Sequence, residues 1–165
     1  MQVLLTGAAP LTPIVGATTL HKDMKMDRHY SIVLADGHQM VREGVRKIIE
    51  EKDGFHVVGE ASDGRQLLEI TKSTIPDLVI VDISIPNLRE YNAIKEIKGL
   101  GEGVKVLFLS MHDHPEYLDY ALEHGVEGFV IKQNVDLELH SAIDKIRRGE
   151  TYVPSVFQGQ LTRWP

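Results

Sequence analysis

From residue 30 onward, the hydrophobic and polar positions of the chain follow two patterns in turn. The first is a short, nearly continuous apolar run, which is typical of a buried β-strand. It occurs in residues 31–35, 55–61, 77–82, 104–110 and 126–132. The second is an apolar residue at every third or fourth position, which predicts helices after these strands. It occurs in residues 38–54, 65–73, 88–100, 115–125 and 136–149.

The residues at the helix ends agree with this division. Asp63 is a suitable N-cap for the second helix, because its carboxylate can accept a hydrogen bond from a free backbone amide. Pro115 stands near the start of the fourth helix and Gly125 at its end, the usual asymmetry of helix termini. The third helix is predicted from the spacing of Leu88, Tyr91, Ile94 and Ile97.

The strict alternation of strands and helices indicates the fold class. The first, third and fourth strands are apolar at almost every position, as expected when both faces of a sheet are covered. We therefore predict an α/β domain, in which a parallel sheet has helices on both sides. The last residues, TYVPSVFQGQLTRWP, have no helical period and are interpreted as a tail.

The amino-acid composition excludes several classes of function. The chain has 165 residues, a net charge of −6 and no cysteine. The length suits one domain with flanking segments. The absence of cysteine excludes disulfides, thiolate metal sites and a cysteine nucleophile, and it fits a reducing compartment such as the cytoplasm. The negative charge argues against nucleic-acid binding, and no apolar run approaches the ~20 residues of a membrane span.

Residues 1–29 precede the regular pattern and are mildly apolar. A secretory signal has a basic start and an uninterrupted apolar centre. No basic residue occurs early in this segment, and Pro10 and Pro13 interrupt it. We interpret it as a flexible leader, or as an upstream start in a chain whose natural start is Met24 or Met26.

Polar residues end four of the five predicted strands. They are Asp36, Asp82, Ser110 and Lys132. Each alone has an ordinary explanation, since acids and serines often cap turns and lysines are usually solvated. Together they form a set, because ligands of an open α/β sheet bind outside the carboxyl ends of its strands. With strand order 2-1-3-4-5, all four would converge on one edge.

Such a set suits phosphoryl chemistry. Two carboxylates attract Mg²⁺, which prefers a few carboxylates, retained waters and phosphate oxygens. A lysine supplies a point charge for a phosphoryl group, and a carboxylate can itself become an aspartyl phosphate. The P-loop and nucleophile-elbow motifs are both absent from the sequence. The HDH triplet at 112–114 lacks a third convergent metal ligand and is interpreted as a solvated loop.

Several segments closely resemble the receiver domain of bacterial two-component response regulators, and the NarL/FixJ-type group in particular. They are VLADGHQMVREGV, VVGEASDG, PDLVIVDISIP, VLFLSMHD, GVEGFVIK and IRRGETYV. The resemblance covers residues 30–153, which would be the receiver domain. It implies a flavodoxin-like (βα)5 fold, a doubly wound parallel sheet with strand order 2-1-3-4-5. It also implies a cytoplasmic signalling protein of a phosphorelay rather than an enzyme.

The resemblance assigns roles to the residues at the strand ends. Asp82 would be the phosphoacceptor, supplied by a sensor histidine kinase, and Lys132 would pair with the phosphoryl group. The implied cofactor is Mg²⁺, held by Asp36, Asp82 and the backbone carbonyl of Ser84.

The resemblance also implies a conformational switch. Ser110 would move toward the phosphoryl group, and Phe129, three residues before Lys132, would turn inward. The surface of the fourth helix, fifth strand and fifth helix would then change. The implied partners are a downstream protein and a second copy of the chain, bound through that surface or through the first and fifth helices.

Three departures from the family pattern leave alternatives open. Gly37 replaces the second of two adjacent acids, which weakens the expected Mg²⁺ site because affinity follows ligand charge. Glu90 stands where the family has glycine, so the turn after Asp82 or the start of the third helix should differ. Residues 154–165 resemble the start of a linker, but the output helix-turn-helix is lacking. The main alternative is therefore a pseudo-receiver, a protein-binding module without phosphorylation, and DNA binding is not expected from this chain.

Overall fold

A computed structural model describes residues 29–163 of the chain. Five parallel strands form one sheet in the order β2-β1-β3-β4-β5, which confirms the predicted fold class and strand order. The strands are β1 (Tyr30–Ala35), β2 (Phe55–Ala61), β3 (Leu78–Asp82), β4 (Lys105–Ser110) and β5 (Gly128–Ile131). Apart from its last residue, the predicted leader lies outside the described residues.

Helices follow the strands in the predicted alternation. They are α2 (Gln39–Glu50), α3 (Gly64–Thr74), α4 (Ala93–Lys98), α5 (Pro115–Glu123) and α6 (Val135–Arg147), with the 3₁₀ segments η1 (Lys132–Asn134) and η2 (Ser155–Arg163). Within the described part of the chain, no helix is long and apolar enough to cross a bilayer.

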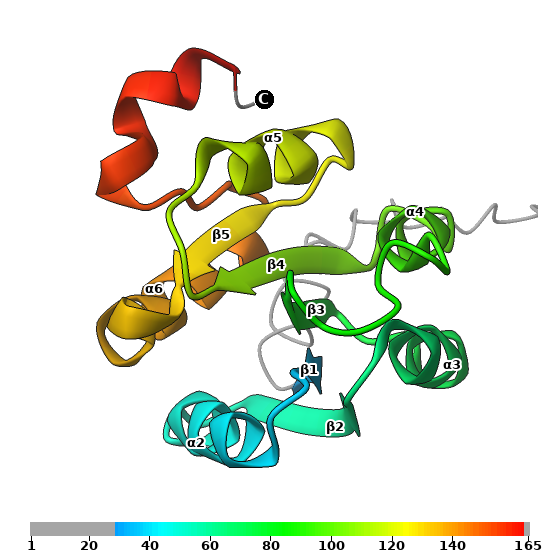
Figure 1. Ribbon diagram of the computed structural model, residues 1–165. Coiled ribbons are helices and arrows are strands. Elements are labelled where there is room, and N and C mark those ends of the chain that lie inside the picture. Colours follow the sequence, from blue (N-terminus) through cyan, green and yellow to red (C-terminus); the bar gives the residue numbers. More distant parts are fainter. Residues whose placement is uncertain (1–28, 164–165) are drawn as a thin grey trace, which may run out of the picture.

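The sheet is the middle of three layers. Helices α2 and α6 cover one face, and α3, α4 and α5 cover the other (Figure 1). All five positions of β3 are buried, since this central strand has a helical layer on each side. Because strand side chains alternate between faces, Phe108 and Phe129 point toward α5 whereas Leu107 and Val130 point toward α6. Two apolar clusters result, one under each layer.

The residues predicted at the ends of the second and fourth helices agree with the structure. Asp63 is the N-cap of α3, and its Oδ1 accepts a hydrogen bond from Gln66 N at 2.9 Å. Pro115 is the first residue of α5, and Gly125 follows its end with a φ of 62°. Strand β5 ends one residue early, so Lys132 begins η1 instead of ending the strand.

The prediction for the third helix is wrong in its first half. A helix was expected over residues 88–100, but α4 covers only Ala93–Lys98. Asn92 has a left-handed backbone with a φ of 46°, so the helix cannot extend back through it. Tyr91 is consequently 46% exposed instead of joining the apolar face. Glu90 itself does not have a positive φ; the left-handed positions of this loop are Asn87 and Asn92.

The tail is more ordered than its sequence pattern indicates. Tyr152 forms a parallel bridge with Gly128, which lies in β5. Residues 155–163 form η2, and Phe157 within it is 2% exposed. The chain after α6 therefore packs on the domain, because two aromatic residues anchor it.

Candidate functional site

Three of the predicted site residues lie together at the carboxyl edge of the sheet. Lys132 Nζ donates a hydrogen bond to Asp36 Oδ2 and a second, of 2.8 Å, to Asp82 Oδ2. Asp36 is fully buried, and Asp82 is 3% exposed. The convergence that the strand ends predicted is thus confirmed for these three side chains.

The sheet topology brings these residues together. Asp82 is the last residue of β3, and Asp36 directly follows β1, the strand paired with β3. Lys132 directly follows β5, which lies beyond β4 in the sheet. Its long side chain therefore has to reach back across the end of β4 to meet the two carboxylates.

The loop after β3 fixes the orientation of Asp82. Its Oδ1 accepts hydrogen bonds from the backbone N–H and from the hydroxyl of Ser84, each at 2.8 Å. Ile83 N donates to Leu109 O at 2.9 Å, which holds the start of the loop against β4. One carboxylate oxygen is therefore held by Ser84 and the other by Lys132.

Two residues that the sequence reasoning missed hold Asp36. His38 donates its backbone N–H to Asp36 Oδ1 at 2.8 Å, and its Nδ1 lies 3.4 Å from the same oxygen. Arg42 Nη1 donates to the backbone carbonyl of Asp36 at 2.7 Å. The only sequence signal for Arg42 is its position one turn into the helix that follows the acid.

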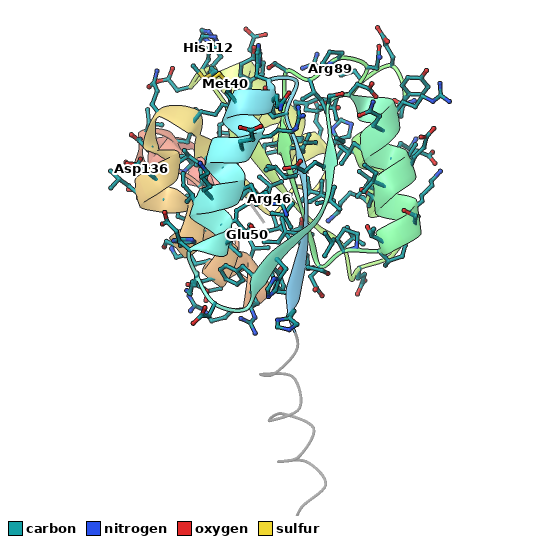
Figure 2. The ribbon with its side chains drawn as sticks, turned by 90° about the horizontal axis from the view of Figure 1, so that it is seen from below. Met40, Arg46, Glu50, Arg89, His112 and Asp136 are labelled. Atoms are coloured by element: carbon teal, nitrogen blue, oxygen red, sulfur yellow. The ribbon has the colours of Figure 1, made fainter. Side chains whose placement is uncertain are left out.

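Ser110 lies at the same edge of the sheet, but its hydroxyl bonds to the backbone of the following loop. Its hydroxyl donates to the carbonyl of His112 at 2.7 Å and accepts from the N–H of His112 at 3.0 Å. These two bonds form a local turn after β4 and orient the hydroxyl to the loop. Figure 2 shows His112 at the same end of the molecule as Met40, which lies at the start of α2.

Phe129 is completely buried in this structure. Its ring packs edge-on against Phe157, with 5.5 Å between the ring centroids and 88° between the planes. The predicted inward movement on phosphorylation would thus start from a ring that is already enclosed.

Two acidic side chains of the site share one lysine. Two buried carboxylates face one ammonium group, and Gly37 contributes no side chain. Among the described residues, no group of three or more acids, histidines or cysteines could hold a metal ion. Two carboxylates and nearby carbonyls still match the oxygen ligands of Mg²⁺, which keeps several waters when it binds proteins. The residues fit such an ion, with one acid fewer than the family pattern.

The comparison with protein families agrees with this geometry. The response regulator receiver domain family matches residues 32–144. Similar proteins include the transcriptional regulatory protein DegU of Brevibacillus brevis, 32% identical over 74% of this chain and 52% of that protein. The oxygen regulatory protein NreC of Staphylococcus carnosus is 35% identical over 74% of this chain and 57% of that protein. The chain spans about half the length of these curated relatives.

Solved structures give the same result. A LuxR-family two-component response regulator from Aurantimonas sp. SI85-9A1 has a TM-score of 0.74 and 30% identity, covering 80% of this chain and 94% of that one. The isolated REC domain of RcsB from Salmonella enterica serovar Typhimurium, with the phosphomimetic BeF3−, has a TM-score of 0.70 and 27% identity. That match covers 78% of this chain and 95% of the RcsB chain.

The relatives are signalling and regulatory proteins rather than classical enzymes. Phosphorylation and Mg²⁺ are typical of their family. The match covers more than half of this chain and includes Asp36, Asp82 and Lys132. The chain therefore belongs to the response regulator receiver domain family of two-component systems.

Proposed function

We propose that Asp82 accepts a phosphoryl group from a phosphohistidine of a sensor histidine kinase and that the chain signals by a conformational switch. The bond from Lys132 to Asp82 is the observation that carries this proposal. A buried carboxylate held next to a cation, at the edge where α/β sheets bind ligands, is suited to phosphoryl transfer. Family membership supports the same chemistry.

The transfer needs one nucleophile and neutralisation of charge. An oxygen of Asp82 forms a bond to phosphorus while the P–N bond of the donor breaks, and the electron pair of that bond returns to the imidazole. Lys132 stabilises the negative charge of the transferred group, and Ser84 keeps the carboxylate in one orientation. Catalysis then consists of positioning and charge stabilisation, as is general for phosphoryl transfer.

Asp36, Asp82 and the carbonyl of Ser84 are the groups that would hold Mg²⁺. The bound ion would supply further neutralisation of the phosphoryl oxygens. Asp36 is prepared for this role, because His38 and Arg42 fix its backbone and one carboxylate oxygen. Gly37 lowers the number of anionic ligands, so we expect weak binding of the ion.

Ser110 and Phe129 are the residues through which we expect the switch to act. To reach a phosphoryl oxygen, the Ser110 hydroxyl has to leave its bonds to His112. The surface of α5, β5 and α6 would then change and be sensed by a downstream protein. A second copy could bind there or along α2 and α6, and one solved RcsB structure contains dimers of that protein. We place this signalling in the cytoplasm and expect no DNA binding by these residues.

The test is phosphoryl uptake by the intact chain. With saturating Mg²⁺ and acetyl phosphate, we expect the intact mass to show one added phosphoryl group. The variant Asp82→Ala should take up none. Asp53→Ala, which removes an exposed carboxylate far from this edge, should behave as the wild type. Absence of uptake by the wild type would refute the proposal.

Gly37 favours a second candidate function. Without a second acid, Lys132 already neutralises part of the charge of Asp36 and Asp82. The domain could then act as a pseudo-receiver, a protein-binding module that undergoes no phosphorylation. In that case Asp82→Ala should leave partner affinity unchanged, and any dependence of affinity on phosphorylation would exclude this function.

A further inference from the structure

The segment that follows α6 is attached to β5 by backbone hydrogen bonds. Phe129 N donates to the carbonyl of Tyr152 at 2.9 Å, and Tyr152 N donates to the carbonyl of Glu127 at 3.0 Å. Tyr152 therefore extends the sheet by one residue beyond β5. Its phenol group is also partly buried, and this burial raises the pKa of Tyr152 to about 12.

A side-chain contact completes the attachment. Phe157 is 2% exposed and packs edge-on against Phe129, an arrangement that aromatic pairs favour. A turn closed by the bond from Phe157 N to Pro154 O, of 3.0 Å, brings the ring back over the strand. The neighbouring Val156 is 55% exposed, so this segment buries selected side chains and leaves others in solvent.

The strand that receives this segment also leads into the phosphorylation site. β5 has only four residues, Gly128–Ile131, and Lys132 follows directly. Phe129 and Lys132 are three residues apart, which corresponds to about 10 Å along a strand. Phe129 of this short strand thus contacts Phe157, and Lys132, the residue after the strand, contacts Asp82.

We propose that residues 152–157 form a latch, docked on β5 by Tyr152 and Phe157, which is released when Asp82 is phosphorylated. This inference rests on the function proposed above. It adds a route by which phosphorylation of Asp82 changes the position of the residues after Phe157. The residues of the latch are distinct from those that hold the carboxylates.

The release follows from the position of Lys132. A phosphoryl group adds negative charge and new acceptor oxygens. The ammonium group of Lys132 therefore moves from its place between Asp36 and Asp82 toward the phosphoryl oxygens. The end of β5 moves with it, because Lys132 is the next residue of the chain. A packed core changes between discrete arrangements rather than deforming gradually. The backbone bonds to Tyr152 and the ring contact with Phe157 belong to a short segment outside the five strands, so we expect these contacts to break first.

The test measures hydrogen exchange of the amides of Phe129 and Tyr152 in the full chain. Samples with and without acetyl phosphate and Mg²⁺ are compared, and phosphoryl uptake is read from the intact mass of the same samples. We expect exchange at both amides to rise about threefold to tenfold on phosphorylation, the size expected for loss of one aromatic pair. The amides of the central strand β3 serve as the internal reference.

A variant tests the coupling from the opposite direction. Phe157→Leu keeps an apolar side chain but removes the ring, so the latch should open without phosphorylation. Because coupling between two sites is reciprocal, this variant should bind BeF3− about threefold to tenfold more tightly than the wild type. Val156→Ala, an exposed change in the same segment, should bind BeF3− as the wild type does.

The outcomes separate the two proposals. Phosphoryl uptake with unchanged or slower exchange at Phe129 and Tyr152 overturns the latch and leaves phosphorylation of Asp82 intact. Absence of uptake overturns the proposed function and the latch together. The exchange comparison uses the wild type alone, so a loss of stability in Phe157→Leu does not affect it.

Discussion

Lys132 Nζ lies 2.8 Å from Asp82 Oδ2, although 50 residues separate them in the sequence. The same ammonium group bonds to Asp36, and its side chain is only 7% exposed. A single buried cation therefore holds two buried carboxylates at one edge of the sheet. Its replacement should affect stability as well as phosphoryl chemistry, because both acids would lose their partner.

We expect Lys132→Met to lower the free energy of unfolding by about 3–5 kcal/mol at neutral pH, the usual cost of leaving a buried charge unpaired. Urea denaturation followed by circular dichroism measures this change. The control is Lys52→Met, because Lys52 pairs with Asp144 at a site where the lysine side chain is 43% exposed. That change should cost less than about 1 kcal/mol. An equal decrease in the free energy of unfolding in the two variants would show that the buried ion pairs of Lys132 stabilise the fold no more than an exposed ion pair does.

Gly37→Asp should strengthen Mg²⁺ binding by about tenfold, because metal affinity rises with the number of anionic ligands. The backbone at Gly37 has space for a side chain: a Cβ there would lie 3.7 Å from Pro86 Cδ and 3.9 Å from Ser62 O. Isothermal titration with MgCl₂ measures the affinity. Gly44→Asp adds the same charge within α2, where a Cβ meets nothing within 4 Å, and should leave the affinity nearly unchanged. A similar gain in both variants would point to long-range attraction rather than a ligand.

Gly64→Ala should disturb the loop that carries Ser84. Gly64 N donates to Pro86 O at 2.8 Å, and a Cβ at Gly64 would lie 2.5 Å from Asn87 O and 2.7 Å from Leu88 Cα. These are backbone atoms that cannot move aside alone. We expect a loss of about 1–3 kcal/mol in the free energy of unfolding and slower phosphoryl uptake.

The matched control for Gly64→Ala is Gly103→Ala, because a Cβ at Gly103 meets nothing within 4 Å. Urea denaturation and the mass-based uptake assay compare the two variants. Unchanged phosphoryl uptake in a folded Gly64→Ala protein would mean that the close contact between the start of α3 and residues 86–88 does not position the loop that carries Ser84.

Stability should fall at high pH because of two half-buried tyrosines, Tyr30 and Tyr152. Burial is the main cause that raises the pKa of Tyr152 from 10.0 to about 12, and burial likewise raises the pKa of Tyr30, with a further contribution from the charge of Asp77. Folding thus favours the neutral phenols. The contribution of Tyr152 is complete below pH 10 and is lost as the pH rises through about 12, and the contribution of Tyr30 is likewise lost at high pH.

The measurement is the free energy of unfolding between pH 9 and 12, together with the ultraviolet absorbance of tyrosinate. Tyr152→Phe should remove one late tyrosinate transition and make the decline of stability less steep. A decline that is unchanged in Tyr152→Phe and Tyr30→Phe would assign it to other groups.

The sequence predicts the sheet well, because strands that are buried on both faces need apolar residues at nearly every position. The same reasoning locates Asp36, Asp82 and Lys132, since parallel strands bring their carboxyl ends to one edge. It fails where tertiary contacts override local pattern. Tyr91 has helical spacing with Ile94, yet the left-handed backbone of Asn92 separates them and leaves Tyr91 exposed.

The hydrogen-bond partners of the polar side chains could not be predicted from the sequence either. Nothing in the pattern indicates that Ser110 bonds to the backbone of His112 or that Arg42 holds the carbonyl of Asp36. The packing of Phe157 on Phe129 was missed for a similar reason, since residues 152–157 (YVPSVF) have neither a helical nor an alternating pattern that would indicate which side chain is buried. The roles of Asp82, Ser84, Ser110 and Phe129 in phosphorylation stay predictions until uptake is measured.

The attachment of Tyr152 to β5 has a consequence for self-association. Exposed edge strands offer free backbone groups that can pair with other chains and start aggregation. At the β5 edge, Tyr152 already occupies the groups of Glu127 and Phe129. At the opposite edge, the register between β1 and β2 shifts at Val58, and such a bulge makes a strand a poor template. Both open edges of the sheet are thus unsuited to further strand pairing, so a shortened protein that ends before Tyr152 should aggregate more readily than one that includes it.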